Sequence, residues 1–313
     1  MTFVDAERTA DLLERTSNWA PSVAIVMPAF NEADRIGDTF AAIATYLLRT
    51  GRSVPIFLAD DGSTDRTPGV AWATAERLGL DLAILRMPHR GKALTVRDAM
   101  LAVSGRVEAD LLMMLDADNE IAIDQLEHVI WSEDPRTVYI ARRVAEAHGA
   151  LGATPRLVLR LMSVGMRLAA RVLLGLPFTD TQCGFKLFPR SLAFELFSQQ
   201  RSSGWVFDAE LLVIARASGL PIREVPVVWQ PRGVSRVRTT AAVTSAFGLL
   251  MIAVRRWIGR YRRVGRSDRP GPAAHPWRGL RHRRTARFEI APRPVQRLRA
   301  QRPEPDPVLS SET

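Results

Sequence analysis

Between residues 22 and 115, short apolar runs alternate with longer segments in which apolar residues recur at helical spacing. An unbroken apolar run of about five residues is typical of a buried strand, and spacings of three and four residues are typical of an amphipathic helix. Their alternation predicts βαβ units and therefore an α/β fold with a mainly parallel sheet flanked by helices. The predicted strands are 22–27, 55–59, 82–87 and 110–115, and the predicted helices are 36–50, 67–78 and 92–103.

A polar motif follows each of the four predicted strands. The carboxyl ends of parallel strands meet at one edge of the sheet, and this edge is where α/β proteins bind their ligands. The sequence therefore predicts one site built from four loops. The motifs are Pro28-Ala29-Phe30-Asn31-Glu32, Asp60-Asp61-Gly62-Ser63-Thr64-Asp65, Pro88-His89-Arg90-Gly91-Lys92 and Asp116-Ala117-Asp118.

The fourth motif carries two carboxylates separated by one residue. Magnesium is usually held by one or two carboxylates together with substrate phosphates. We therefore predict that Asp116 and Asp118 bind Mg²⁺ or Mn²⁺. A solvated turn explains an isolated Asp-x-Asp better, but it leaves the other three strand-end motifs without a role.

The rest of the composition bears on the compartment. Cys183 is the only cysteine among 313 residues, so no disulfide can form within the chain and a reducing compartment is expected. Residues 1–20 lack the apolar core of a signal peptide. The uncharged stretch 241–254 is shorter than the roughly 20 residues that a membrane-spanning helix needs. These features predict a cytoplasmic protein.

Positive charge is concentrated at the end of the chain. Residues 255–313 contain sixteen arginines and five acidic residues, a net charge of +11, whereas residues 1–254 carry a net charge of −1. Residues 262–313 are rich in proline and lack apolar periodicity, which predicts a mostly disordered tail. Such a tail can bind nucleic acid or anionic lipid. A solvated extension without function explains its composition at least as well.

The four strand-end motifs, taken in order, resemble those of inverting nucleotide-sugar glycosyltransferases of the GT-A type, family 2. Three later motifs are similar to those of the dolichyl-phosphate β-glucosyltransferases and, more distantly, the dolichyl-phosphate mannose synthases. The resemblance covers about residues 21–238, with seven motifs in register. The later motifs are Asp180-Thr181-Gln182-Cys183-Gly184-Phe185-Lys186-Leu187-Phe188, Trp205-Val206-Phe207-Asp208-Ala209-Glu210 and Pro226-Val227-Val228-Trp229.

Two departures from the family are evident. The eukaryotic glucosyltransferases carry an amino-terminal membrane anchor that has no counterpart here. The family's late Gly-x-Ser-Lys reads Gly233-Val234-Ser235-Arg236. Arginine is a competent substitute at this place, because its fork binds phosphate through two hydrogen bonds.

The resemblance implies roles for individual residues. Asp116, Asp118 and Asp208 would be the catalytic carboxylates, although we expect Asp208 and its neighbour Glu210 to orient groups or contact the sugar. The acceptor phosphate would be bound by Arg142, Arg156 and Ser163. The nucleotide sugar would be bound by Pro28, Phe30, Glu32, Asp60, Asp61, Lys92, Asp116, Ala117, Asp118, Arg232, Ser235 and Arg236.

Simpler alternatives exist for several of these residues. Phe30 would be a core residue, Asp60 or Asp61 would cap the helix that follows, and Lys92 would be a surface charge.

The segment 156–174 carries an argument of its own. Arg156, Arg160, Arg167 and Arg171 fall within about 60° of one another on a helix that turns 100° per residue. One arginine stripe on an otherwise apolar helix suits a membrane interface with acidic head groups or a lipid phosphate. A core helix with a solvated arginine edge is the alternative. Residues 241–258 predict a second in-plane helix, so we expect peripheral attachment to the inner face of the cell membrane.

Together these features divide the chain into four segments. They are an amino-terminal extension at 1–20, a GT-A glycosyltransferase domain at 21–238, an amphipathic interfacial helix at 239–261 and the arginine- and proline-rich tail at 262–313.

The leading hypothesis is transfer of a hexose from a nucleotide sugar to a polyprenyl monophosphate, with inversion to a β-linked product. The resemblance favours UDP-glucose as the donor, with GDP-mannose as the alternative. A phosphate monoester has a second pKa near 6, so it is largely dianionic at neutral pH and needs no general base.

Two other hypotheses remain open at this point. A hydroxyl acceptor on a soluble molecule or polysaccharide would make Asp208 an essential base. A binding module for nucleic acid or membranes that acts through the tail would leave the strand-end motifs unexplained. We therefore expect an anionic membrane surface, and no nucleic acid, among the partners.

Overall fold

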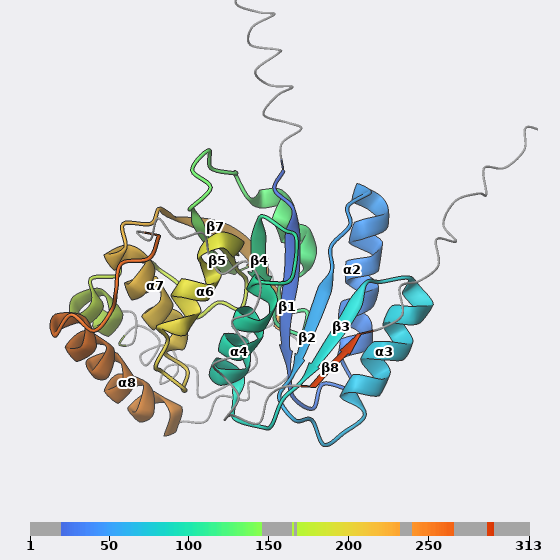
Figure 1. The fold of residues 1–313 in the computed structure, drawn as a ribbon, viewed down its shortest axis with the longest axis horizontal. Coiled ribbons are helices and arrows are strands. Elements are labelled where there is room, and N and C mark those ends of the chain that lie inside the picture. The colour runs from blue at the N-terminus through green and yellow to red at the C-terminus, as the bar shows by residue number, and fades with distance from the viewer. Residues whose placement is uncertain (1–19, 146–164, 166–167, 232–239, 266–286, 291–313) are drawn as a thin grey trace, which may run out of the picture.

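The computed structural model describes residues 20–145, 165, 168–231, 240–265 and 287–290. Its middle layer is a sheet whose described strands follow the order β7-β5-β6-β4-β1-β2-β3-β8 (Figure 1). Four neighbours, from β4 to β3, are parallel, whereas β6 runs antiparallel between β4 and β5, and β8 runs antiparallel to β3. The strands are β1 (Val23–Ala29), β2 (Ile56–Asp60), β3 (Leu82–Arg86), β4 (Leu111–Met114), β5 (Val138–Ala145), β6 (Lys186–Pro189), β7 (Ile222–Trp229) and β8 (Arg287–Ile290).

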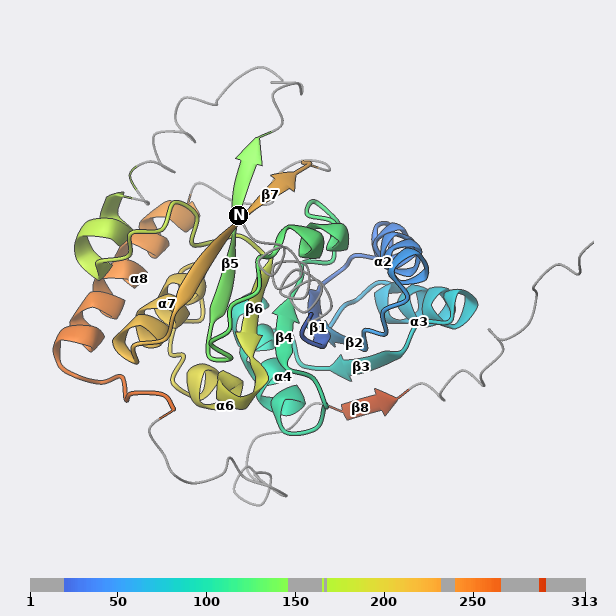
Figure 2. The ribbon, with the colours of Figure 1, turned by 90° about the horizontal axis from the view of Figure 1, so that it is seen from above.

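Helices cover both faces of the sheet (Figure 2). Residues of the central strand β1 alternate between the two layers: Ile25 and Met27 belong to one core, and Ala24 and Val26 belong to the other. The first layer contains α2 (Ile36–Thr50), α3 (Thr67–Leu78) and the 3-10 helix η1 (Ile123–His128). The second contains α4 (Lys92–Ser104), α6 (Arg190–Ser198) and α7 (Phe207–Ala217), with α8 (Thr240–Trp257) beside α7.

The first half of the chain follows the sequence prediction closely. Helices α2 and α3 begin and end at the predicted residues, and α4 is one residue longer than predicted. Local chemistry explains the bounds. Gly51 ends α2 and Gly79 ends α3 in the left-handed conformation, with φ of 67° and 66°, which glycine adopts without steric cost.

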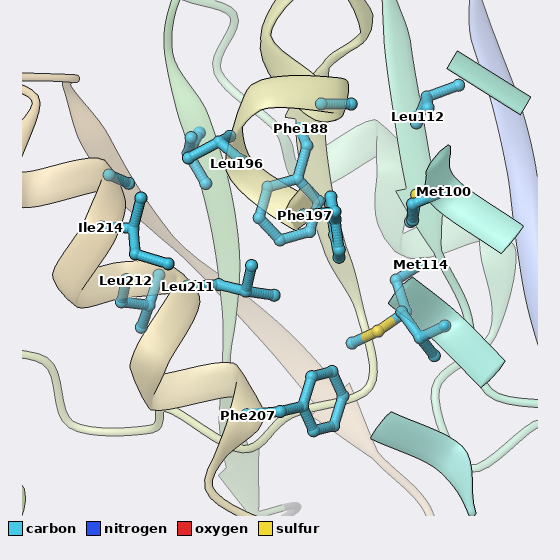
Figure 3. Packing of buried hydrophobic residues seen from close by; sticks show 14 of the residues in the cluster. Met100, Leu112, Met114, Phe188, Leu196, Phe197, Phe207, Leu211, Leu212 and Ile214 are labelled. Atoms are coloured by element: carbon cyan, nitrogen blue, oxygen red, sulfur yellow. The ribbon is translucent and has the colours of Figure 1, made fainter. Parts of the chain in front are cut away.

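The core on the second face joins distant parts of the chain (Figure 3). Phe188 of β6 and Phe197 of α6 meet edge to face, with ring centroids 5.0 Å apart and an interplanar angle of 76°. Met114 of β4 and Phe207 of α7 belong to the same cluster. Because β4 leads into Asp116 and α7 carries Asp208, this core fixes the two carboxylates relative to each other.

The predicted tail differs from expectation where the structure describes it. Residues 287–290 form β8, although the segment 262–313 was predicted to be mostly disordered. An edge strand is held by backbone hydrogen bonds, so it can form without apolar periodicity. The sequence pattern therefore did not indicate β8. Residues 262–265 also contact the helical layer: Arg262 N–H donates to Gln199 Oε1 at 2.5 Å, and Val264 N–H donates to Ser218 Oγ at 2.9 Å.

The two predicted interfacial segments are described in part. Helix α8 covers 240–257, close to the predicted 241–258, and residues 168–174 of the predicted helix 156–174 are helical. Arg256 joins the two, because its Nη1 donates to the Leu174 carbonyl at 2.5 Å. Among the described residues, no helix has the length and apolar character to cross a membrane. Large apolar side chains are nevertheless exposed on both segments; they are Leu168, Val172, Leu173, Phe247, Leu250, Val254 and Trp257.

Candidate active site

Asp116 and Lys92 form an ion pair at the carboxyl end of β4. Lys92 is the first residue of α4, and its Nζ lies 2.6 Å from Asp116 Oδ1 and 2.7 Å from Oδ2. Gly184 makes room for this carboxylate, because a Cβ at position 184 would lie only 2.1 Å from Asp116 Oδ2. The two side chains are 34% and 31% exposed, so a ligand entering from solvent can reach them.

Asp118 lies beside this pair. Its Oδ1 accepts the N–H of Glu120 at 3.1 Å, and Thr39 of α2 donates its hydroxyl to the Ala117 carbonyl at 2.6 Å. Burial raises the pKa of Asp118, and the negative charge of Asp116 raises it further. The negative charges of Asp116 and Asp118 therefore lie close together and are only partly neutralised by Lys92.

This crowding fits the predicted cation. Two carboxylates completed by substrate phosphates are the ligand set that Mg²⁺ prefers. Within the part of the chain that the structure describes, no group of three or more acidic, histidine or cysteine side chains could hold a metal without further ligands. Asp116 and Asp118 are therefore suited to a metal that arrives with, or is completed by, a diphosphate.

A second ion pair lies deeper. Asp208, in the first turn of α7, is 4% exposed, and its Oδ1 accepts a hydrogen bond at 2.8 Å from Lys186 Nζ on β6, which is fully buried. Lys186 also donates to the Cys183 carbonyl. Burial raises the pKa of Asp208, and the positive charges of Lys186 and Lys92 oppose this effect. Lys186 was not among the predicted site residues. A lysine among the apolar residues of its motif was nevertheless a signal, since a fully buried lysine is almost always paired.

The two pairs belong to one electrostatic network. Burial lowers the pKa of Lys92, but the charges of Asp116, Asp208 and Asp118 outweigh burial and leave that pKa raised. Lys92 therefore stays protonated between carboxylates that come from β4 and α7.

Asp61 organises the loop that follows β3. Its Oδ1 accepts the Arg90 N–H at 2.9 Å and the Thr95 hydroxyl at 2.6 Å. Its Oδ2 accepts the Gly91 N–H at 2.9 Å and lies 2.9 Å from His89 Nδ1. Four partners occupy the acceptor positions of this carboxylate, so its visible role is to shape the loop before Lys92.

Asp60 is also buried, and its Oδ1 accepts the Ser63 N–H at 3.2 Å. At the start of α3 the Thr67 N–H is bound by Asp65, whose Oδ1 accepts it at 2.9 Å, so the capping alternative for Asp60 and Asp61 does not hold. Gly62 is required between the two loops: its φ is +71°, and a Cβ there would lie 2.8 Å from the backbone nitrogen of His89.

The loop after β1 presents an aromatic surface. The ring of Phe30 stacks on His89 with centroids 4.1 Å apart and an interplanar angle of 22°. Phe30 is partly buried and belongs to neither hydrophobic core, so it is not the core residue of the simpler alternative. Asn31, with φ of 54°, fastens this loop to the next one, because its Oδ1 accepts the Thr64 N–H at 2.9 Å. Neither His89 nor Asn31 was among the predicted site residues. Their contacts could be predicted only if the neighbouring loops were known.

Two more predicted donor-site residues lie on the same loop. Pro28 is buried in β1 opposite Ala59 of β2. Glu32 pairs with Arg35, whose Nε lies 2.8 Å from Glu32 Oε2.

Arg142 and Arg143 occupy opposite faces of β5. Arg143 binds Asp180, with Nε 2.6 Å from Oδ2, and lies 5.7 Å from the centre of the Trp229 ring. Arg142 is partly buried and shares its strand face with Ile140, which packs in the core of the α4 and α7 layer. Arg142 is therefore on the side of the sheet that carries Lys92 and Asp208. The other predicted ligands, Arg156, Ser163, Arg232, Ser235 and Arg236, lie outside the described residues.

Two carboxylates and a lysine lie together at the carboxyl edge of the parallel strands, the edge at which α/β proteins bind their ligands. The chain belongs to glycosyl transferase family 2, whose sequence pattern matches residues 24–197. With the family match, the carboxylates and the lysine identify a nucleotide-sugar-dependent hexosyltransferase. The predicted enzyme class is thereby confirmed.

Relatives of known identity support the more specific resemblance. A dolichyl-phosphate β-glucosyltransferase of Trichomonas vaginalis is 30% identical over 257 residues, which cover 78% of this chain and 74% of that protein. The dolichyl-phosphate β-glucosyltransferase of Drosophila melanogaster is 29% identical over 281 residues, covering 83% of this chain and 84% of that protein.

A solved structure shares the fold. Glucosyl-3-phosphoglycerate synthase from Mycobacterium tuberculosis, in complex with Mn²⁺, UDP-glucose and phosphoglyceric acid, gives a TM-score of 0.53 at 18% identity. The match covers 79% of this chain and 83% of that chain. The predicted GT-A-like α/β fold is confirmed.

Proposed function

We propose that this protein transfers glucose from UDP-glucose to a polyprenyl monophosphate, with inversion, to give a β-linked polyprenyl phosphate sugar. The observation that carries the proposal is the strand-end cluster in which Asp116, Asp118 and Lys92 face the buried Asp208–Lys186 pair. The similarity to dolichyl-phosphate β-glucosyltransferases supports both the sugar and the acceptor.

On the donor side, Asp116 and Asp118 hold Mg²⁺ or Mn²⁺. Such an ion supplies a Lewis acid for the charge that develops on the departing diphosphate. Lys92 binds the diphosphate through the ammonium group that pairs with Asp116 in the free protein. The Phe30–His89 stack borders the pocket for the base, and Asp61 keeps the backbone of residues 90–91 in position for a phosphate.

On the acceptor side, the nucleophile is the phosphate oxygen itself. Because that oxygen is already anionic at neutral pH, the protein has to position it rather than deprotonate it. Asp208 is committed to Lys186, so we assign it to holding the site together instead of removing a proton. Arg142 binds the acceptor phosphate from the α7 side of the sheet.

The lipid acceptor requires contact with a membrane, and we assign this to the arginines of the segment 156–174, of the end of α8 and of the basic tail, aided by the exposed apolar residues of 168–174 and α8. Attachment would be peripheral and on the cytoplasmic face. High salt should release much of the protein, because the Debye length falls to about 3 Å at 1 M. Resistance to both high salt and alkaline carbonate would contradict peripheral attachment.

The direct test is incubation with Mn²⁺, polyprenyl phosphate and a panel of labelled nucleotide sugars. We expect label from UDP-glucose to enter the lipid fraction as a mild-acid-labile β-glucosyl phosphate. If only label from GDP-mannose enters the lipid, the transferred sugar is mannose instead of glucose. If sugar is transferred only to hydroxyl acceptors, and Asp208→Asn abolishes that transfer, the acceptor is a hydroxyl and Asp208 is the base.

Arg142→Ala tests the acceptor site separately. Loss of charge-assisted hydrogen bonds of about 1.5–3 kcal/mol should raise the KM for polyprenyl phosphate roughly ten- to a hundredfold. Arg142→Lys should rescue only part of this loss, because lysine keeps the charge without the fork. The Kd for UDP-glucose should hardly change. A collapse of nucleotide binding with an unchanged acceptor KM would assign Arg142 to the donor site.

A further inference from the structure

An arginine-lined cavity lies outside the active site, between α6, the end of α8 and the loop that follows it. Its volume is about 800 Å³, and its lining residues include Arg201, Arg255, Arg260 and Arg262 together with Tyr261. The lining residues that the structure describes include no acidic side chain. Nothing in the proposed sugar transfer uses these residues.

One buried carboxylate forms the support of this cavity. Glu210 is fully buried; its Oε1 lies 3.2 Å from Arg255 Nη1 and accepts the Tyr261 hydroxyl at 2.7 Å. Its Oε2 accepts the N–H groups of Arg201 and Ser202 at 2.8 and 2.6 Å. Glu210 was expected to orient groups or contact the sugar, and the contacts described for it lie on the side of this cavity. Glu210 and Asp208 are two residues apart on α7, so their side chains point about 200° apart.

The charges around the cavity do not balance. Glu210 offsets one positive charge, that of Arg255. Among the described residues, no carboxylate is seen to pair with the side chains of Arg201, Arg260 or Arg262. Guanidinium groups that have no carboxylate partner in the described part of the chain repel one another around this concavity, and a bound multivalent anion would relieve that repulsion. Phosphate suits them, because each guanidinium can hold two phosphate oxygens.

The loop that carries Arg260 and Arg262 is anchored to the helical layer. Besides the bond from Arg262 N–H to Gln199, Gly265 N–H donates to Glu195 Oε2 at 3.0 Å. The Tyr261 hydroxyl is fixed on Glu210, and burial together with the Glu210 charge raises the pKa of Tyr261 so that it remains a donor. The arginines therefore project from a fixed backbone.

The surroundings of the cavity indicate the source of the phosphate. Trp257 and Ile258 lie between Arg255 and Arg260 in the sequence and are 89% and 56% exposed. An exposed tryptophan beside arginines at the end of an amphipathic helix is typical of the head-group level of a membrane. A phosphate reaching this cavity from that side would belong to a lipid.

We propose that this cavity binds the phosphate head group of an anionic membrane lipid. It would act within the membrane attachment proposed above and apart from sugar transfer. Such a site seats the end of α8 at a fixed depth and orientation, which diffuse attraction by the basic tail cannot do.

Vesicle flotation of the full-length protein tests the site. Three double variants are compared on phosphatidylcholine vesicles with and without phosphatidic acid. Arg260→Gln/Arg262→Gln removes two charges from the cavity, and Arg260→Lys/Arg262→Lys keeps the charges but loses the forks. The control, Arg49→Gln/Arg77→Gln, removes two exposed charges from the last turns of α2 and α3, on the far side of the sheet from α8 (Figure 1).

We expect the glutamine pair to weaken binding to acidic vesicles by at least about tenfold, which is 1.4 kcal/mol. The lysine pair should show an intermediate loss, and the control should behave like the wild type. Sugar transfer to acceptor in detergent should be unchanged in all three. The proposed site would be overturned if the lysine pair bound acidic vesicles like the wild type while the glutamine pair and the control lost binding equally. Such a result would mean that diffuse positive charge, and not this cavity, attracts the membrane.

Inorganic pyrophosphate serves as the soluble probe. The lipid assignment is wrong under one combination of results: the wild type binds pyrophosphate, the glutamine pair does not, and the vesicle association of the two proteins is the same. The cavity would then be a site for soluble phosphates. Loss of transfer in detergent with intact vesicle binding would place the arginines in the transfer reaction. Because flotation needs no turnover, a failure of the proposed sugar transfer leaves the test of the cavity readable.

Discussion

The Asp116–Lys92 pair and the Asp208–Lys186 pair use the same two chemical groups in different surroundings. Asp116 and Lys92 are each about one-third exposed, whereas Lys186 is 0% and the Asp208 side chain 6% exposed. An exposed pair exchanges partners at low cost, because water and ions replace the lost contact. A buried pair cannot, since either charge left alone would remain poorly solvated. The first pair can open for a ligand, and the second holds β6 against α7.

The largest expected effect comes from breaking the buried pair. Lys186→Met leaves the Asp208 charge buried and unpaired, which should lower the free energy of unfolding by about 3–5 kcal/mol. The matched variant Lys92→Met should cost less than about 1 kcal/mol. Denaturant unfolding measures both. Equal losses in the two variants would remove the distinction between the pairs.

A companion variant guards against loss of folding. Lys186→Met/Asp208→Leu removes both charges, and apolar replacement of a whole buried pair is often nearly neutral. Recovery of most of the stability in this double variant would attribute the loss in Lys186→Met to the unpaired charge.

The next effect concerns the exposed side of the comparison. Asp118→Asn should lower turnover by at least about tenfold, because it removes one charge from the metal site while the fold survives. EDTA should stop turnover in the wild type. Initial rates over a Mn²⁺ series, with circular dichroism as the check on folding, measure this. Near-normal activity of Asp118→Asn in saturating Mn²⁺ would make the Asp pair a turn.

A smaller effect would show that the exposed pair opens. Lys92 and a divalent cation compete for Asp116, so Lys92→Met should tighten Mn²⁺ binding in the absence of nucleotide. Loss of an exposed pair predicts about a two- to fivefold change. Titration calorimetry measures it, and the KM for UDP-glucose should rise at the same time. Weaker Mn²⁺ binding in Lys92→Met would mean that Lys92 supports the metal site instead of competing for it.

The smallest effect is the pH dependence of stability. Burial and the charge of Asp116 raise the pKa of Asp118 in the folded state. Ionisation of Asp118 therefore lowers the stability of the fold at pH values above the raised pKa, and it has no effect at pH values below the pKa of the unfolded chain. Asp118→Asn should therefore stabilise the metal-free protein at about pH 8, on the order of 0.5 kcal/mol after solvent screening. The gain should fade as the pH drops towards about 4. Thermal unfolding in EDTA across this range measures it, and a gain that grows at low pH has the wrong sign.

The loops of the proposed donor site were predictable because their chemistry is local. Each motif follows its own strand, and parallel strands in consecutive βαβ units bring their ends together without further information. The strand-end positions of Asp116, Asp118, Asp61 and Phe30 were predicted in this way, whereas the roles of Asp61 and Phe30 came from the family resemblance. Their partners were harder: the contacts of Asp61 with residues 89–91 and Thr95 depend on the approach of two loops, which a single sequence does not encode as a pattern.

Asp208 and Arg142 were predicted, but the surroundings of Asp208 were not, because the order of the strands in space differs there from their order in sequence. Strand β6 enters antiparallel between β4 and β5, and this insertion brings Gly184 against Asp116 and Lys186 against Asp208. The alternation of apolar runs and helical segments in the sequence does not indicate this insertion of β6. Strand β8 was missed for a related reason, since its pairing partner lies in the first third of the chain.

Strand β8 also has a consequence for how the chain is made. It covers the free edge of β3, which ends at Arg86, but it begins only at Arg287. At translation speeds of about 5–20 residues per second, the edge of β3 waits on the order of 10–40 s for its cover. During that time its unpaired backbone groups can pair with another nascent or misfolded chain. A protein truncated before Arg287 would keep this edge open permanently, so loss of the last residues should appear first as aggregation during expression.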